Sequence, residues 1–169
     1  MSKEQIIEIP AFVKLTKEQI RELFNNYTNG GNYIKIAGLR NCLFNYFNVT
    51  QESENFDDIV KYTEILYNLA DGNGFFNAHD GRLNFNEFSK IITLLPKKYS
   101  SPKKSLARMI YLMMDVDKKG YISSRDYLDF MQKSQLRVTK ENLKDEIEIM
   151  DRNDDHYISY NEFMEIYGV

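Results

Sequence analysis

The sequence predicts an all-α protein made of four helix–loop–helix units, arranged as two lobes of two units each, with short β bridges between paired loops. One observation is a twelve-residue pattern of oxygen-bearing side chains near the C-terminus, which recurs three times upstream in less complete form. Amphipathic helical periodicity flanks the loops. The second observation is an isoleucine or leucine at the eighth position of every loop, where two loops can pair: Ile34, Leu83, Ile122 and Ile158.

Composition excludes several classes of protein. A chain of 169 residues with 43% apolar and 28% charged side chains is typical of one soluble domain or two small ones. A net charge of −3 gives no reason to expect nucleic acid binding, and no apolar run approaches the roughly 20 residues of a membrane span. No secretory signal is evident at the N-terminus, and the single cysteine, Cys42, fits a reducing compartment and the core of a helix, so we expect a cytoplasmic monomer.

The fourth unit has the most complete loop, residues 151–162 (DRNDDHYISYNE). Its candidate ligands occupy positions 1, 3, 5, 7, 9 and 12, which is the spacing of an EF-hand calcium loop: Asp151, Asn153, Asp155, Tyr157, Ser159 and Glu162. The alternative is an acidic turn between two helices. Position 6 of such a loop is normally glycine, because the turn requires a positive φ there. Here position 6 is His156, and histidine tolerates a positive φ better than most residues. We therefore expect calcium affinity to be weakened rather than abolished.

The third unit has its loop at residues 115–126 (DVDKKGYISSRD). This loop keeps the same residue spacing but is altered as a metal site. Lys119 puts an ammonium group where an oxygen ligand belongs, and the terminal carboxylate is the shorter aspartate. Both changes oppose calcium binding, and magnesium is a comparable alternative here. The candidate ligands are Asp115, Asp117, Tyr121 and Asp126.

The second unit is interrupted, since residues 74–79 stand where one residue is expected and the loop is 17 residues long. If the insertion bulges outward, the two ends of the loop can still converge, because closure entropy grows slowly with length. The other frame puts Phe76 and Ala78 at positions 1 and 3, which cannot ligate. Whether this site works stays open, and its candidate ligands are Asp71, Asn73, Asp80, Arg82 and Glu87.

The first unit retains only the scaffold, because its loop at residues 27–38 contains no carboxylate. Thr16 and Thr139 are expected to cap helices. Two of the three prolines and a lysine pair fall in residues 96–102, which indicates a boundary there. We therefore expect an N-terminal lobe at residues 1–95, a linker at 96–104 and a C-terminal lobe at 105–169.

The chain resembles the calmodulin and troponin C branch of the EF-hand superfamily. The resemblance extends from LTKEQIRELF at residues 15–24, through DGRLNFNEF at 80–88, to the last loop. It implies two paired lobes, calcium as the bound ion, and a regulated surface for a target helix. The chain departs from that pattern, because one loop is nearly intact, one is interrupted, one carries a lysine and one is empty.

Methionine is distributed unevenly. All methionines except Met1 lie on the helices of the third and fourth units, and we expect them to line a groove for an amphipathic helix of a target protein: Met109, Met113, Met114, Met131, Met150 and Met164. The alternative is that they fill the core between four helices. The leading hypothesis is a calcium-responsive, calmodulin-like sensor without catalytic activity. The alternatives are a calcium-independent, light-chain-like subunit and a calcium buffer.

An enzyme is not expected. The only histidines, His79 and His156, lie inside loops, and no nucleophile with a base or phosphate-binding loop accompanies them.

Overall fold

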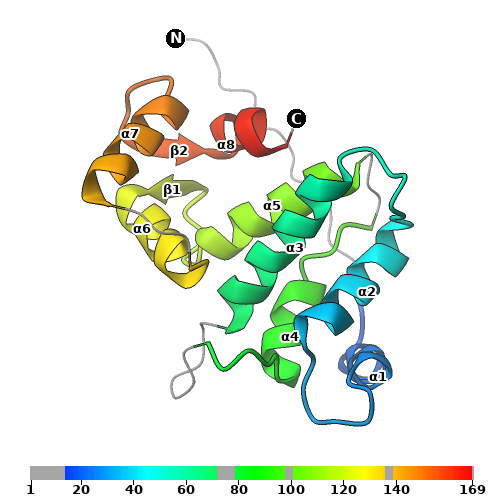
Figure 1. Cartoon of the computed structure of the whole chain (residues 1–169). Coiled ribbons are helices and arrows are strands. Elements are labelled where there is room, and N and C mark those ends of the chain that lie inside the picture. Colours follow the sequence, from blue (N-terminus) through cyan, green and yellow to red (C-terminus); the bar gives the residue numbers. More distant parts are fainter. Residues whose placement is uncertain (1–13, 72–78, 98–100, 136–138, 169) are drawn as a thin grey trace.

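The computed structural model describes residues 14–71, 79–97, 101–135 and 139–168, and it is mostly helical (Figure 1). Within this part of the chain there are eight α-helices and one two-stranded antiparallel sheet. The elements in chain order are α1 (Lys17–Tyr27), α2 (Ile36–Phe47), α3 (Phe56–Asp71), α4 (Phe85–Ile92), α5 (Pro102–Met114), β1 (Tyr121–Ser123), α6 (Ser124–Lys133), α7 (Lys140–Met150), β2 (Tyr157–Ser159) and α8 (Tyr160–Tyr167). The predicted all-α fold of helix–loop–helix units is confirmed.

Side-chain caps fix where several of these helices begin. Thr16 accepts a hydrogen bond from the Gln19 N–H at the start of α1, and Thr139 accepts one from the Asn142 N–H at the start of α7. Ser101 caps α5, whose first residue, Pro102, has no N–H to satisfy at that position. The two threonine caps predicted from the sequence are confirmed.

The loops pair through the residues at position 8. Ile34 and Leu83 form an antiparallel bridge in which each N–H donates to the other carbonyl at 2.8 Å. Ile122 lies opposite Ile158 in the β1–β2 pair. All four side chains are buried, so each bridge also fixes an apolar contact between two loops. The predicted bridges between the first and second loops and between the third and fourth loops are confirmed.

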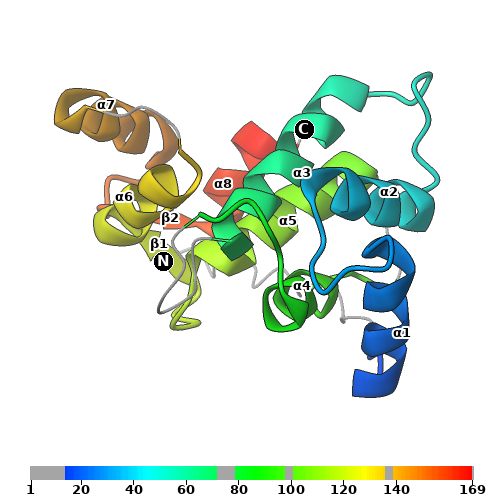
Figure 2. The same ribbon diagram turned by 60° about the horizontal axis from the view of Figure 1, so that its bottom comes forward.

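Helices α3 and α5 lie side by side at the centre of the molecule. Figures 1 and 2 show α1, α2 and α4 on one side of them and α6, α7 and α8 on the other. The buried apolar side chains form one cluster that contains residues of all four units. The two halves of the chain therefore share a core.

Two further features agree with the sequence. Cys42 is buried on α2, and burial raises the pKa of its thiol to about 12, so it is a core residue rather than a reactive thiol. None of the helices in the described ranges is long and apolar enough to cross a membrane.

Candidate metal centres

Three of the four loops are closed by the same hydrogen bond between positions 1 and 6. The main-chain N–H at position 6 donates to the Oδ2 atom of the aspartate at position 1. The pairs are Gly81 to Asp71 (3.0 Å), Gly120 to Asp115 (2.8 Å) and His156 to Asp151 (2.8 Å). The second loop keeps this contact despite its insertion, so the two ends of that loop do converge.

Position 6 adopts the left-handed conformation in each of these loops. The φ angles are 72° for Gly81, 86° for Gly120 and 68° for His156. Glycine adopts this conformation freely, whereas it costs conformational free energy for a residue with a Cβ. The histidine of the fourth loop therefore carries strain that the two glycines do not.

Replacing His156 by glycine is expected to tighten calcium binding by about fivefold, which corresponds to a strain of about 1 kcal/mol. Calorimetric titration of the full chain measures the change. His156→Ala is the matched control, because it removes the imidazole but keeps the Cβ. An equal gain in both variants would show that the imidazole, rather than backbone strain, limits the affinity.

Positions 9 and 12 form a capping box at the start of the helix that follows each of the three loops. The pairs are Asn84 with Glu87, Ser123 with Asp126, and Ser159 with Glu162. In each pair the side chain at position 9 accepts from the N–H at position 12, and the carboxylate at position 12 accepts from the N–H at position 9. The spacing of a capping box is present in the sequence, but the sequence analysis considered four of these residues only as candidate ligands: Glu87, Asp126, Ser159 and Glu162.

The fourth loop gathers most of its predicted ligands by short local contacts. Asp151 Oδ1 and Asn153 Oδ1 both accept from the Asp155 N–H at 3.1 Å. Glu162 reaches across the loop, because its Oε1 accepts from the Arg152 N–H at 3.0 Å while its Oε2 accepts from the Ser159 hydroxyl at 2.6 Å. Glu162 is only 8% exposed. Its carboxylate thus lies between the two ends of the loop.

Asp154, which the sequence reasoning did not include, also lies among potential ligands. One ligand atom from each of Asp151, Asp154 and His156 falls within 4.8 Å of the others. Asp154 occupies position 4 and His156 position 6, and both have a positive φ, 58° and 68° respectively. The turn conformation brings these side chains beside the position-1 aspartate, and alternate-residue spacing gives no signal for it.

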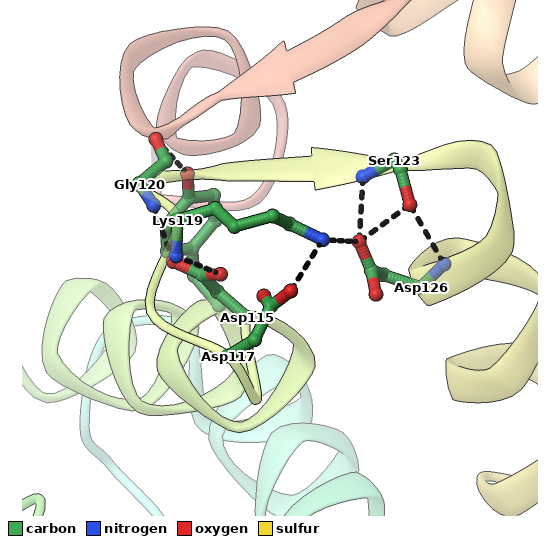
Figure 3. Close-up of polar contacts among 7 residues, drawn as sticks. Asp115, Asp117, Lys119, Gly120, Ser123 and Asp126 are labelled. Carbon is green, nitrogen blue, oxygen red and sulfur yellow. Dashed lines mark hydrogen bonds and ion pairs between the residues drawn. The ribbon is translucent and has the colours of Figure 1, made fainter.

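In the third loop, Lys119 lies among the side chains of the candidate ligands Asp117 and Asp126 (Figure 3). Its Nζ is 3.0 Å from Asp117 Oδ2 and 3.0 Å from Asp126 Oδ2. Asp126 Oδ2 also accepts from the Ser123 hydroxyl at 2.6 Å. The ammonium group therefore pairs with the carboxylates at positions 3 and 12, as a tethered cation.

The protonation of this cluster follows from its geometry. Hydrogen bonds to Asp126 and Asp117 raise the pKa of Lys119, so the ammonium form is stabilised. Burial acts to raise the pKa of Asp126, but hydrogen bonds from Ser123 and Lys119 outweigh it and lower that pKa. Both groups are thus charged at neutral pH, and the loop carries its own counter-charge.

The second loop is different, because no ion pair of Asp71, Asp80 or Glu87 is found within the described ranges. Asp71 is 2% exposed, and its Oδ1 has no hydrogen-bond partner among the described residues. Burial raises the pKa of Asp71, with the nearby Asp80 adding to the shift and the Gly81 N–H opposing it. Burial also raises the pKa of Glu87, and Asp71 and Asp80 add to it. A buried, partly unsatisfied carboxylate beside like charges is the environment that a bound cation would relieve.

Two other candidate ligands of the second loop are placed differently. The Arg82 guanidinium lies 4.5 Å from the centre of the Tyr33 ring. Asn73 falls outside the described residues. In the first loop, Gly30 has a φ of 82°, and the loop contains no carboxylate.

The other position-7 residues belong to the β pair. Tyr121 and Tyr157 begin β1 and β2, and their rings contact each other with centroids 4.4 Å apart.

The candidate groove methionines lie largely inside the protein. Met109, Met114, Met131 and Met150 are buried, whereas Met113 and Met164 are half-buried and pack against the core. Any groove lined by these side chains requires the helices of this lobe to move.

The class of protein is defined by two pairs of helix–loop–helix units, each pair joined by an antiparallel loop bridge, with acidic residues in three of the four loops. Residues 103–168, which hold the third and fourth units, match the family model of the EF-hand domain pair. EF-hand pairs bind calcium in general. No curated protein matches the chain.

Proposed function

We propose that this protein is a calcium-responsive regulatory protein whose principal calcium site is the fourth loop. The observation that carries the proposal is the contrast between the third and fourth loops. In the third loop Lys119 forms ion pairs with Asp117 and Asp126, whereas no lysine or arginine of the described ranges forms an ion pair with Asp151, Asp155 or Glu162. The fourth loop therefore retains negative charge for a divalent cation, and Asp151, Asn153, Asp155, Tyr157, Ser159 and Glu162 would hold it.

The second loop is proposed as a weaker calcium site. Its support is the buried Asp71, whose Oδ1 lacks a partner among the described residues. The 17-residue loop must also order its insertion when it binds, which lowers the affinity. The third loop is proposed not to bind calcium. Magnesium is the alternative ion for this loop.

Calcium binding is proposed to expose a surface for a target helix. Glu162 is the third residue of α8, so any movement of its carboxylate moves the start of that helix. The next residues, Phe163 and Met164, belong to or pack against the core. A shift of α8 would therefore uncover apolar side chains, among them methionines that adapt to varied shapes.

The tethered cation in the third loop favours one alternative function. Because the Lys119 ammonium pairs with Asp117 and Asp126, the third loop has an internal counter-charge and would not need calcium to balance these two carboxylates. A light-chain-like subunit that holds a helix regardless of calcium would use such a loop. A simple calcium buffer would bind the ion without binding a helix.

Calorimetry of the full chain with calcium, followed by a synthetic amphipathic helical peptide, separates these functions. We expect calcium binding dominated by one site, and peptide binding at least tenfold tighter with calcium than with chelator. Equal peptide affinity in chelator would favour the light-chain-like subunit. Calcium binding with no peptide binding in either condition would favour the buffer.

A further inference from the structure

Helices α3 and α5 have no exposed face near the centre of the molecule. No residue from Ile65 to Asp71 of α3 is exposed, and none from Ser105 to Met114 of α5. A helix in a single four-helix lobe buries one stripe and leaves the other side in water. The second side of each helix must therefore be covered, and Figures 1 and 2 show α3 and α5 lying against each other.

Polar contacts also join the two halves of the chain beside the contact between α3 and α5. The Tyr62 hydroxyl on α3 donates to the main-chain carbonyl of Tyr167 on α8 at 2.8 Å. Lys103 Nζ at the start of α5 lies 2.8 Å from Asp58 Oδ2 on α3. Arg108 on α5, which is 3% exposed, donates to the Leu94 carbonyl at 3.5 Å. We call the packing of α3 against α5 and α8, with these contacts, the interlobe seam.

The seam reaches the fourth loop through one short helix. Tyr167 ends α8, and Glu162 lies in the first turn of the same eight-residue helix. A helix this short moves as one piece, because each of its residues is within about two turns of the others. A shift of Glu162 therefore displaces the Tyr167 carbonyl that Tyr62 holds.

We propose that the interlobe seam is an internal latch. Helix α3 covers the side of α5 that a target helix would need, and the Tyr62–Tyr167 hydrogen bond ties this cover to the helix that carries Glu162. This inference rests on the proposed function, because it assumes that calcium at the fourth loop moves α8. It adds that the two lobes act together: calcium loosens the seam, and a looser seam in turn favours calcium.

Tyr62→Phe tests the latch, because it removes the hydroxyl and keeps the ring in the core. Loss of one such hydrogen bond shifts an equilibrium by about two- to tenfold. In the calcium-free full chain we expect amide exchange in α3 to accelerate by that factor. We expect calcium affinity to rise by the same factor, since the open form is the one that calcium favours.

Tyr46→Phe is the matched control. Its hydroxyl also donates to a main-chain carbonyl, that of Pro96, away from α8. It should leave calcium affinity unchanged.

Three results would overturn the latch. Faster exchange in Tyr62→Phe with unchanged calcium affinity would make the seam a purely structural contact. Lower affinity would place the contact in the calcium-bound form, and unchanged exchange would mean that Tyr62 does not hold the seam. Failure of the unmodified chain to bind calcium would instead reject the proposed function, and the exchange of the calcium-free variant would still decide whether Tyr62 holds α3.

Discussion

Glu162→Gln is expected to lower the calcium affinity of the full chain by at least about 100-fold. Substitutions of groups that merely support metal ligands already cost roughly 10- to 100-fold, and Glu162 is proposed as the ligand that supplies two oxygens. Glutamine keeps the length of the side chain but loses the charge and one of the oxygens. Calorimetry with calcium measures the loss directly.

The fold should survive this substitution. One carboxylate oxygen of Glu162 accepts from the Ser159 N–H at 2.8 Å, and the amide oxygen of glutamine can accept the same bond. Glu165→Gln is the control, because Glu165 lies on α8 but is exposed and pairs with Arg152 at 2.5 Å. Undiminished affinity in Glu162→Gln would reject the fourth loop as the principal site. A similar loss in Glu165→Gln would indicate a general charge effect.

The sequence predicted the loops well, because their geometry depends on local spacing. The residues at position 8, such as Ile122 and Ile158, pair as expected because each unit repeats the same twelve-residue register. The interrupted loop was aligned correctly as well, since Gly81 donates to Asp71 as Gly120 donates to Asp115. Gly81 and Gly120 at position 6 supported this frame, because that position is left-handed in all three loops and glycine adopts the left-handed conformation without strain.

The interlobe seam was not predicted, because it depends on contacts between residues far apart in the chain. A signal was nevertheless present in residues 105–114 (SLARMIYLMM), which are apolar on nearly every side of the helix. An α-helix of this kind is normally buried on all sides. The sequence does not say which helix provides the cover, and periodicity alone leaves α3 indistinguishable from other amphipathic helices.

The sequence predicted that Lys119 opposes metal binding, but it did not predict where the Lys119 side chain lies. The lysine was expected to oppose a metal at position 5, whereas the structure shows it paired with two candidate ligands, Asp117 and Asp126. A flexible four-carbon stem can point an ammonium group outward to water or inward across a loop, and sequence does not decide between these directions. The carboxylates at positions 3 and 12 make the inward direction favourable here.

Lys119→Asn is expected to add one calcium ion to the stoichiometry of the full chain. The substitution replaces the tethered ammonium with an oxygen ligand, and it frees Asp117 and Asp126, which with Asp115 would then surround a vacant cation position. Without metal the variant should melt at a lower temperature than the unmodified chain, because these carboxylates then repel each other, and calcium should reverse the loss.

Lys118→Asn is the matched control, since it removes the same charge from the neighbouring position, where φ is 55° and asparagine is well tolerated. Calorimetry and thermal melts with calcium and with magnesium give both readings. An unchanged stoichiometry in Lys119→Asn would show that the shorter Asp126, rather than the lysine, keeps calcium out of the third loop.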